Sequence, residues 1–338
     1  MSNLSIRLDH IVAKLETAPG TAEVLADEDF DSRCFDISFT PTIEMDDNGE
    51  EVATGSHTEQ ESIAGATWGE ISFSTWMCWG GAVGTEPNNW KFLRGCGAKA
   101  TTYPTEGTAV GIGLTPEKSQ DAISLTMYGY KLERGGAAPS ALQFQFVGCV
   151  GNAVVSAANI GGKWMAKYTF KGKLVDIVDV AYAALLEMTS PDTTIAEKML
   201  LNTVTVGGPA MSVSSIELDF GNVVELQTDQ TNATGYSQAV IINRKPRLRM
   251  NPYMKLAASD DVFAIMTGAT IGAVVWTSAP ETPHLTISAP RAQLIAADVG
   301  SREGSATYEK TFKLLRNTAG ADDVAKERTW QILQGAVA

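Results

Sequence analysis

The chain has 338 residues and a mass of 36.0 kDa, a size that suits two domains of ordinary length or one large all-β domain. Hydrophobic residues make up 44% of it and charged residues 19%, which argues against disorder and suits burial of surface against neighbouring subunits. The net charge of −13 is concentrated, because residues 1–61 contain 15 acidic and only three basic side chains. A chain without a basic footprint is a poor candidate for sequence-specific nucleic-acid binding.

No targeting or membrane-spanning pattern is found in the sequence. The first ten residues lack a basic segment followed by an apolar one, so we expect no secretory signal. No apolar run approaches the roughly 18 residues of a membrane-spanning helix. The cysteines are widely separated and form no C-x-x-C pair, which predicts free, buried thiols made in a reducing cytoplasm at Cys34, Cys78, Cys96 and Cys149.

Short runs of alternating apolar and polar residues dominate the chain, and Gly, Pro, Asn and Asp separate them. This pattern is typical of β-sandwiches and barrels, because strand side chains alternate between the two faces of a sheet. The chain is therefore predicted to be mainly β. In chain order the strands are expected at residues 37–40, 70–74, 123–132, 142–147, 164–170, 214–220, 239–250, 272–277, 284–287 and 306–314.

Two short helices are predicted between these strands. The first follows the stretch from Glu86 to Asn89 and ends at Gly95. The second is expected from Ser259 to Gly268, with Ser259 as its N-cap and two aspartates at the positive end of the helix dipole. Both helices lie between an upstream strand pair and a downstream strand rich in small residues.

An internal duplication is predicted from matching segments in the two halves. Residues 152–161 align without a gap with residues 291–300, and four of the aligned positions are identical. The tripeptide Thr-Phe-Lys follows in both halves, at residues 169–171 and 311–313. We therefore predict two tandem β-sandwich or barrel domains, each with a flanking short helix, at residues 1–189 and 190–338.

Catalytic and metal-binding patterns are absent from the sequence. It contains no G-x-S-x-G or H-E-x-x-H motif, and its three histidines are far apart. Residues 46–51 carry oxygen ligands but do not follow the EF-hand spacing. We predict a protein without enzymatic activity and without a cofactor. Seven tryptophans and many unplaced carboxylates leave one alternative open, a β-sandwich that binds or cleaves glycans, although packing in a core or interface also explains tryptophans.

One cluster of basic residues stands out, at Arg244, Lys245, Arg247 and Arg249. Pro246 interrupts the cluster, and apolar and polar residues alternate around Leu248. This pattern favours an edge strand whose charges pair with acidic groups on another subunit. A solvated face or a phosphate site would fit the same residues.

Several stretches between residues 14 and 172 occur in an order that resembles a known family. Residues 16–21 match an E-T-x-x-G-T opening, and residues 89–97 resemble a flanking helix followed by glycine. Residues 148–152 form a G-x-x-G-N turn, which precedes a strand ending in F-x-G at residues 170–172. Together they resemble the tail tube proteins, or major tail proteins, of long-tailed bacteriophages.

This resemblance implies a structural protein of the virion tail, assembled in the host cytoplasm. Its copies would self-associate into rings that stack into a tube through which the genome is ejected. Three chains per ring are expected if each chain carries two tube domains, and six if it carries one. The implied partners are a tape-measure protein and the tail terminator and tip proteins, with no membrane. A tube subunit of a contractile injection or secretion apparatus is an alternative.

Site residues follow from the same reading. An acidic lumen would repel DNA and let it slide, so the lumen is predicted to be lined by polar strand faces at Glu70, Ser72, Ser74, Ser215, Glu217 and Asp219. The polar segment 45–62 corresponds to a loop that would contact the adjacent ring, with candidates Asp46, Asp47, Glu50, Glu51, Glu59 and Glu61. Residues 228–237 would be its counterpart. Both loops are expected to be mobile in the monomer and to order on stacking.

Overall fold

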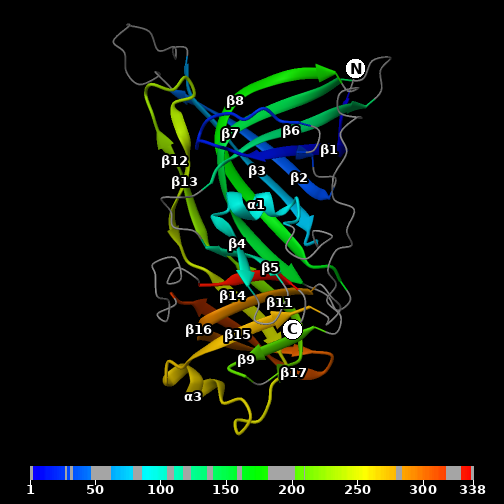
Figure 1. The fold of residues 1–338 in the computed structure, drawn as a ribbon, viewed down its shortest axis with the longest axis vertical. Helices are drawn as coiled ribbons and strands as arrows, with labels where there is room; N and C mark the ends of the chain where they lie inside the picture. The colour runs from blue at the N-terminus through cyan, green and yellow to red at the C-terminus, as the bar shows by residue number, and fades with distance from the viewer. Residues whose placement is uncertain are drawn as a thin grey trace, which may run out of the picture.

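The computed structural model describes residues 3–26, 29–30, 33–46, 62–78, 86–104, 110–116, 123–134, 140–157, 162–181, 202–208, 210–278, 284–316 and 329–335. The predicted fold class is confirmed, because the described chain is mainly β with large antiparallel sheets and two short helices. The molecule is elongated, with the first strands at one end and the helix α3 at the other (Figure 1). Within the described part of the chain, neither helix has the length that a membrane crossing needs.

The end of the molecule that contains the N-terminus is a curved antiparallel sheet (Figure 1). Its strands follow one another in the order β1 (Asn3–Leu15), β6 (Leu125–Arg134), β7 (Ser140–Ala157), β8 (Met165–Ala181), β3 (Ile63–Trp76) and β2 (Cys34–Asp46). An isolated antiparallel β-bridge joins Val12 of β1 to Phe30, which shortly precedes β2 in the chain. Burial alternates along residues 152–157 of β7 and 165–171 of β8, whereas residues 146–151 of β7 are buried on both faces because Ala239 and Ile241 pack over Val150.

The opposite end of the molecule is built on the same sheet. Beyond β7 the strand order continues through β11 (Val213–Asp219), β14 (Arg247–Pro252), β17 (Ser305–Leu314), β16 (His284–Arg302), β15 (Ile271–Thr277), β9 (Thr203–Val206) and β10 (Ala210–Met211). A side branch leaves β16 through β18 (Gln331–Gly335), β5 (Val110–Pro116) and β4 (Ala98–Pro104). Strands from the two halves of the sequence therefore pair at two places, β7 with β11 and β5 with β18.

A long bent hairpin connects the two ends. Its lower part is β11 and β14, and its upper part is the separate two-stranded sheet of β12 (Asn222–Thr228) and β13 (Tyr236–Arg244), which lies along β7 and β8 (Figure 1). The bend lies at Gly221, which has φ +63° and where a side chain would meet the Lys245 carbonyl oxygen at 2.1 Å. Pro246 occupies the opposite strand at this level, which explains the proline within the basic cluster.

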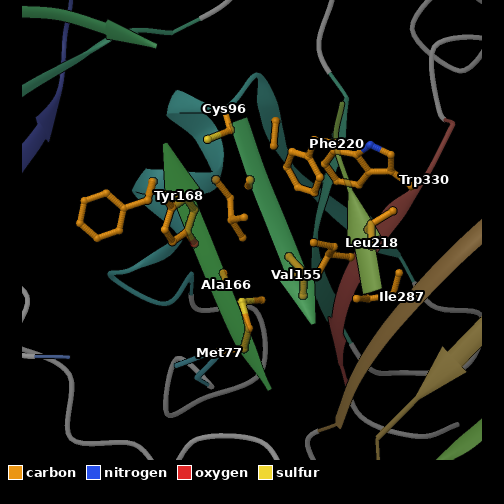
Figure 2. Close-up of a cluster of buried hydrophobic side chains, with 14 of the residues drawn as sticks. Met77, Cys96, Val155, Ala166, Tyr168, Leu218, Phe220, Ile287 and Trp330 are labelled. Carbon is orange, nitrogen blue, oxygen red and sulfur yellow. The ribbon is translucent and has the colours of Figure 1, made fainter. Parts of the chain in front are cut away.

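One large hydrophobic core fills the space behind the shared sheet. Side chains from three strands project into it (Figure 2): Val155 from β7, Ala166 and Tyr168 from β8, and Leu218 from β11, followed by Phe220 directly after β11. Two aromatic stacks join residues from distant parts of the chain, since the Trp164 and Trp276 rings lie 3.6 Å apart and the Phe220 and Trp330 rings 4.0 Å apart. Such stacks contribute about 0.5–1.5 kcal/mol each beyond the apolar area that they bury.

Both predicted helices are present, and one detail of the second was wrong. The first is α1 (Trp90–Gly95), which is buried along most of its length. The second is α3 (Val262–Thr267), whose N-cap is Asp261 rather than Ser259, because the Asp261 carboxylate accepts a hydrogen bond from the Ala264 amide at 2.9 Å. Asp260 instead turns inward and binds the Lys310 ammonium group at 2.7 and 2.8 Å. This buried ion pair fixes the helix to β17.

The two halves share an order of elements but not a register. In each half a short helix precedes a long antiparallel hairpin, β7–β8 in one and β16–β17 in the other. Thr169 lies opposite Asn152, whereas Thr311 lies opposite Ala296 and not opposite Arg291, the residue aligned with Asn152. The proposed boundary near residue 189 lies outside the described residues, so the division at that point stays a prediction.

Removing one partner of the buried ion pair should destabilise the fold strongly. In Lys310→Met the Asp260 carboxylate remains buried without its cation, and we expect a loss of about 3–5 kcal/mol. Thermal and urea unfolding followed by circular dichroism measure this loss. Lys167→Met, which removes an exposed lysine from β8, is the matched control and should change stability little. Equal unfolding midpoints for the two variants would contradict the assigned role.

The four thiols are free, and their reactivity should follow burial. Cys78, Cys96 and Cys149 are buried, while Cys34 is half-buried. Burial raises the pKa of the Cys96 and Cys149 thiols well above the ordinary value, and the negative charge of Glu16 raises the pKa of Cys149 further. We expect a disulfide exchange reagent at about pH 8 to label Cys34 quickly and the other three only after denaturation. Rapid labelling of all four thiols in the native protein would contradict this burial.

Candidate functional site: the polar face of the shared sheet

The six predicted lumen residues project to one face of the shared sheet, but Ser74 is buried there, at 4% exposure. Directly paired residues on neighbouring strands project to the same face. Ser74 lies opposite Lys167, which lies opposite Val154, which lies opposite Asp219. Glu70 and Ser72 project to this face from β3, and Ser215 and Glu217 from β11. The residues between them on β3 and β11 enter the core. Two segments that are more than 140 residues apart therefore contribute to one surface.

The charge of this face differs from the acidic surface that the sequence suggested. Glu70 lies opposite Lys171, and Glu217 forms an ion pair of 2.9 Å with Arg249 on β14. Asp219 accepts hydrogen bonds from the side chain of Asn152 at 2.9 Å and from the Gly221 amide at 2.8 Å. Each acidic group thus has a basic or hydrogen-bonding neighbour. The face is mixed in charge because the partner strands supply the bases.

A cavity of about 250 Å³ opens on this face. The Glu217–Arg249 ion pair lines it, together with Ser156, Ser215, Met250 and Glu309. Hydroxyl, carboxylate and guanidinium groups are all present, but no set of three His, Cys, Asp or Glu residues in the described part of the chain is arranged to hold a metal ion. The cavity is therefore a polar recess in an extended surface, lined by the Glu217–Arg249 ion pair and by Glu309, which forms no ion pair among the described residues.

The basic cluster is divided between two sheets, and the edge-strand prediction was wrong. β14 lies between β11 and β17, so Arg247 and Arg249 belong to an interior strand. Arg249 pairs with Glu217 of the same chain. Arg244 ends β13 and donates hydrogen bonds to the Asn222 side chain at 3.0 Å and to the Gly97 carbonyl at 3.3 Å. Lys245 is exposed beside the bend. Two of the four candidates thus have partners inside the chain.

The predicted ring-contact loop is only partly placed. Asp46 ends β2 opposite Ile63, while Asp47, Glu50, Glu51, Glu59 and Glu61 lie outside the described residues. The counterpart at 228–237 is a hydrogen-bonded turn that needs no neighbouring ring to form. The Thr67 amide donates to the Thr234 carbonyl at 3.0 Å, and the Tyr236 hydroxyl donates to Glu44 at 2.6 Å. This bond to the Glu44 carboxylate, followed by burial, raises the pKa of Tyr236 to about 12.

A buried carboxylate at Glu16 organises the N-terminal segment, and sequence reasoning missed it. Glu16 is only 6% exposed and accepts from the amides of Gly20 and Gly148, each at 2.7 Å. The hydroxyl of Thr126 donates to it at 3.0 Å, and that of Ser124 also donates. Four donors from three segments therefore satisfy one charge. Gly20 and Gly148 have φ +76° and +66°, so glycine suits both positions.

Tryptophans supply little surface for stacking on sugars. Trp90, Trp164, Trp276 and Trp330 are at most 1% exposed and belong to the core. Trp68 and Trp76 are half-buried, and Lys171 and Lys163 lie over their rings. The packing interpretation therefore accounts for four of the six described tryptophans.

Comparison with known proteins gives no relative. No protein-family model matches the chain, and no curated protein matches it significantly.

Neutralising Glu16 should loosen the N-terminal segment. In Glu16→Gln the NH2 group would replace one carboxylate oxygen and place its own donors against one backbone amide and one hydroxyl, so we expect a loss of about 2–4 kcal/mol in the free energy of unfolding. Hydrogen exchange should increase at the amides of Gly20 and Gly148. Glu23→Gln is the control, because Glu23 is half-buried and accepts its hydrogen bonds from the nearby Thr17. Unchanged exchange at both Gly20 and Gly148 in Glu16→Gln would contradict the role of this carboxylate.

Proposed function

We propose that the chain is a structural protein whose copies form rings that stack into the tail tube of a long-tailed bacteriophage. Such a tube conducts the genome during ejection and requires no catalysis. One observation carries the proposal. A single sheet runs through both halves of the chain, and its polar face contains both sets of residues predicted to line a lumen. A wall built from repeated subunits requires a continuous surface of this kind.

The stretches that carry the resemblance also meet in space, which supports the proposal. The E-T-x-x-G-T opening contributes Glu16 and Gly20, and the G-x-x-G-N turn contributes Gly148, whose amide donates to the Glu16 carboxylate. These stretches are 132 residues apart. Their direct contact explains physically why they would occur together in one fold.

The lumen we propose lies over β11 and the adjoining ends of β7, β8 and β3, beside β12 and β13, which cover Val150 on the same face. Its acids have neighbouring bases or hydrogen-bond donors, which limits the number of free cations that could hold phosphates. DNA would then slide without sequence-specific contacts. Three chains per ring follow if each chain contributes two tube units, and six if it contributes one. A glycan-binding function has less support, because the buried tryptophans cannot stack on sugars.

Electron microscopy of the purified protein tests this proposal. We expect rings or hollow tubes in negative stain, formed alone or with a crowding agent and a tail-tip seed. Light scattering on the same sample gives the mass per ring, and a mass of three chains would support two tube units per chain. A strictly monomeric protein under all of these conditions would argue against a tube subunit.

Deleting residues 46–61 tests the predicted ring-contact loop. The deletion removes six acidic residues from a segment that lies between β2 and β3 in the chain. We expect a soluble, folded protein, because the two strands keep most of their pairing, from Cys34–Thr75 to Met45–Ala64. This protein should form no tubes under conditions in which the unaltered chain does. Tubes of normal length from the deletion variant would refute the assignment of this loop.

A further inference from the structure

At two places on the polar face, side chains of like charge lie at directly opposed positions of neighbouring strands. Asp298 on β16 lies directly opposite Glu309 on β17. Arg247 on β14 lies directly opposite Lys313, farther along β17. Like charges at directly opposed positions of an antiparallel pair destabilise a sheet. The strands thus carry an acidic pair and a basic pair, which we call together the charged strip.

The charged strip is accessible, and its charges are not fully neutralised within the chain. Asp298, Glu309 and Lys313 are exposed, and Arg247 is half-buried. Among the described residues none of these four side chains forms an ion pair within 4.0 Å. Asp219 lies opposite Arg247 on its other side and offsets one of the two positive charges, which leaves the basic end with one net positive charge. The acidic end of the strip therefore keeps a net negative charge, and the basic end a net positive charge.

The arrangement of the strip makes it complementary to itself. Glu309 and Lys313 project from the same face of β17 and are four residues apart, so they are separated by about 13 Å. Thr311 and the paired Arg249 lie between the two ends. A two-fold axis in the plane of the contact, perpendicular to β17, would place Glu309 of one copy opposite Lys313 of another, with Asp298 and Arg247 flanking these contacts on opposite sides of β17. Both ends of the strip would be matched at once.

We propose that the charged strip binds the charged strip of a second copy of this chain in an antiparallel, two-fold arrangement. A nucleic acid fits less well, because phosphates would meet Asp298 and Glu309 as well as the basic pair. A cation would engage only the acidic pair. Rings are built from heterologous contacts, whereas this contact is isologous and lies beside the proposed lumen residues Glu217 and Asp219, so it would form between free subunits and not within a ring. Its test does not depend on tube formation.

Charge reversal at exposed positions tests this contact. Sedimentation velocity at about 20 mM salt should show a concentration-dependent dimer, which dissociates at about 500 mM salt because screening weakens exposed charges. We expect Lys313→Glu and Glu309→Lys each to weaken the dimer at least tenfold, since each reversed charge occurs at both ends of the contact. A mixture of the two variants in equal amounts should dimerise again. In the mixed dimer the new carboxylate at position 313 of one variant faces the new ammonium group at position 309 of the other.

Control measurements distinguish loss of this contact from unfolding of the variant and from a change in its net charge. Lys167→Glu makes the same change on the same face of the sheet, about 19 Å away across four strand spacings, and should dimerise as the unaltered chain does. Circular dichroism checks that each variant is folded. A chain that stays monomeric at low salt would overturn the proposal. So would single variants that still dimerise, or a mixture that stays monomeric. Binding of the unaltered chain to a DNA oligonucleotide that is lost in Lys313→Glu, without dimerisation, would also overturn it in favour of nucleic acid.

Discussion

The pairing of β11 with the second half of β7 is the interaction on which the rest of the structure depends. The first half of β7 pairs with β6, and only its last residues, from Val154 to Ala157, pair with β11. This change of partner lets one sheet pass from one half of the sequence to the other. Because side chains alternate along each strand, the pairing also aligns the core faces and the polar faces of both halves. The Phe220–Trp330 stack closes the core just beyond this junction.

Local features of the fold could be predicted because they depend on local sequence. Period-two alternation gave the mainly β class, and turn and capping residues gave both helices within a few residues. Even so, the choice of N-cap between Ser259 and Asp261 depended on a distant residue. Asp260 must reach Lys310 in the core, and this places Asp261 at the start of α3. Strand order was not predictable. The strand β14 pairs with β11, which precedes it by three strands in the chain, and with β17, which follows it by three.

The site was predictable only in part, for the same reason. Alternation along a single strand shows which side chains share a face, and it identified Glu70, Ser72 and Ser74 correctly as neighbours on one face of β3. It gives no information about the adjacent strands, so the bases Lys171 and Arg249 opposite Glu70 and Glu217 were missed. Glu16 stands among small and polar residues and resembles a surface side chain. Its donors at Ser124, Thr126 and Gly148 are more than 100 residues away, and only the fold brings them together.

The pairing of β5 with β18 has a consequence for the synthesis of the chain. Leu114 lies opposite Ile332, so an element of the first half receives one of its partners only when residues 331–335 are available. Trp330, which completes the core against Phe220, comes from the same final segment. On the ribosome the β4–β5 hairpin must therefore wait through more than 200 residues of translation, with one edge open to other nascent chains. The β5 edge is therefore paired only after residues 331–335 have been synthesised, so this topology does not allow the fold to be completed domain by domain.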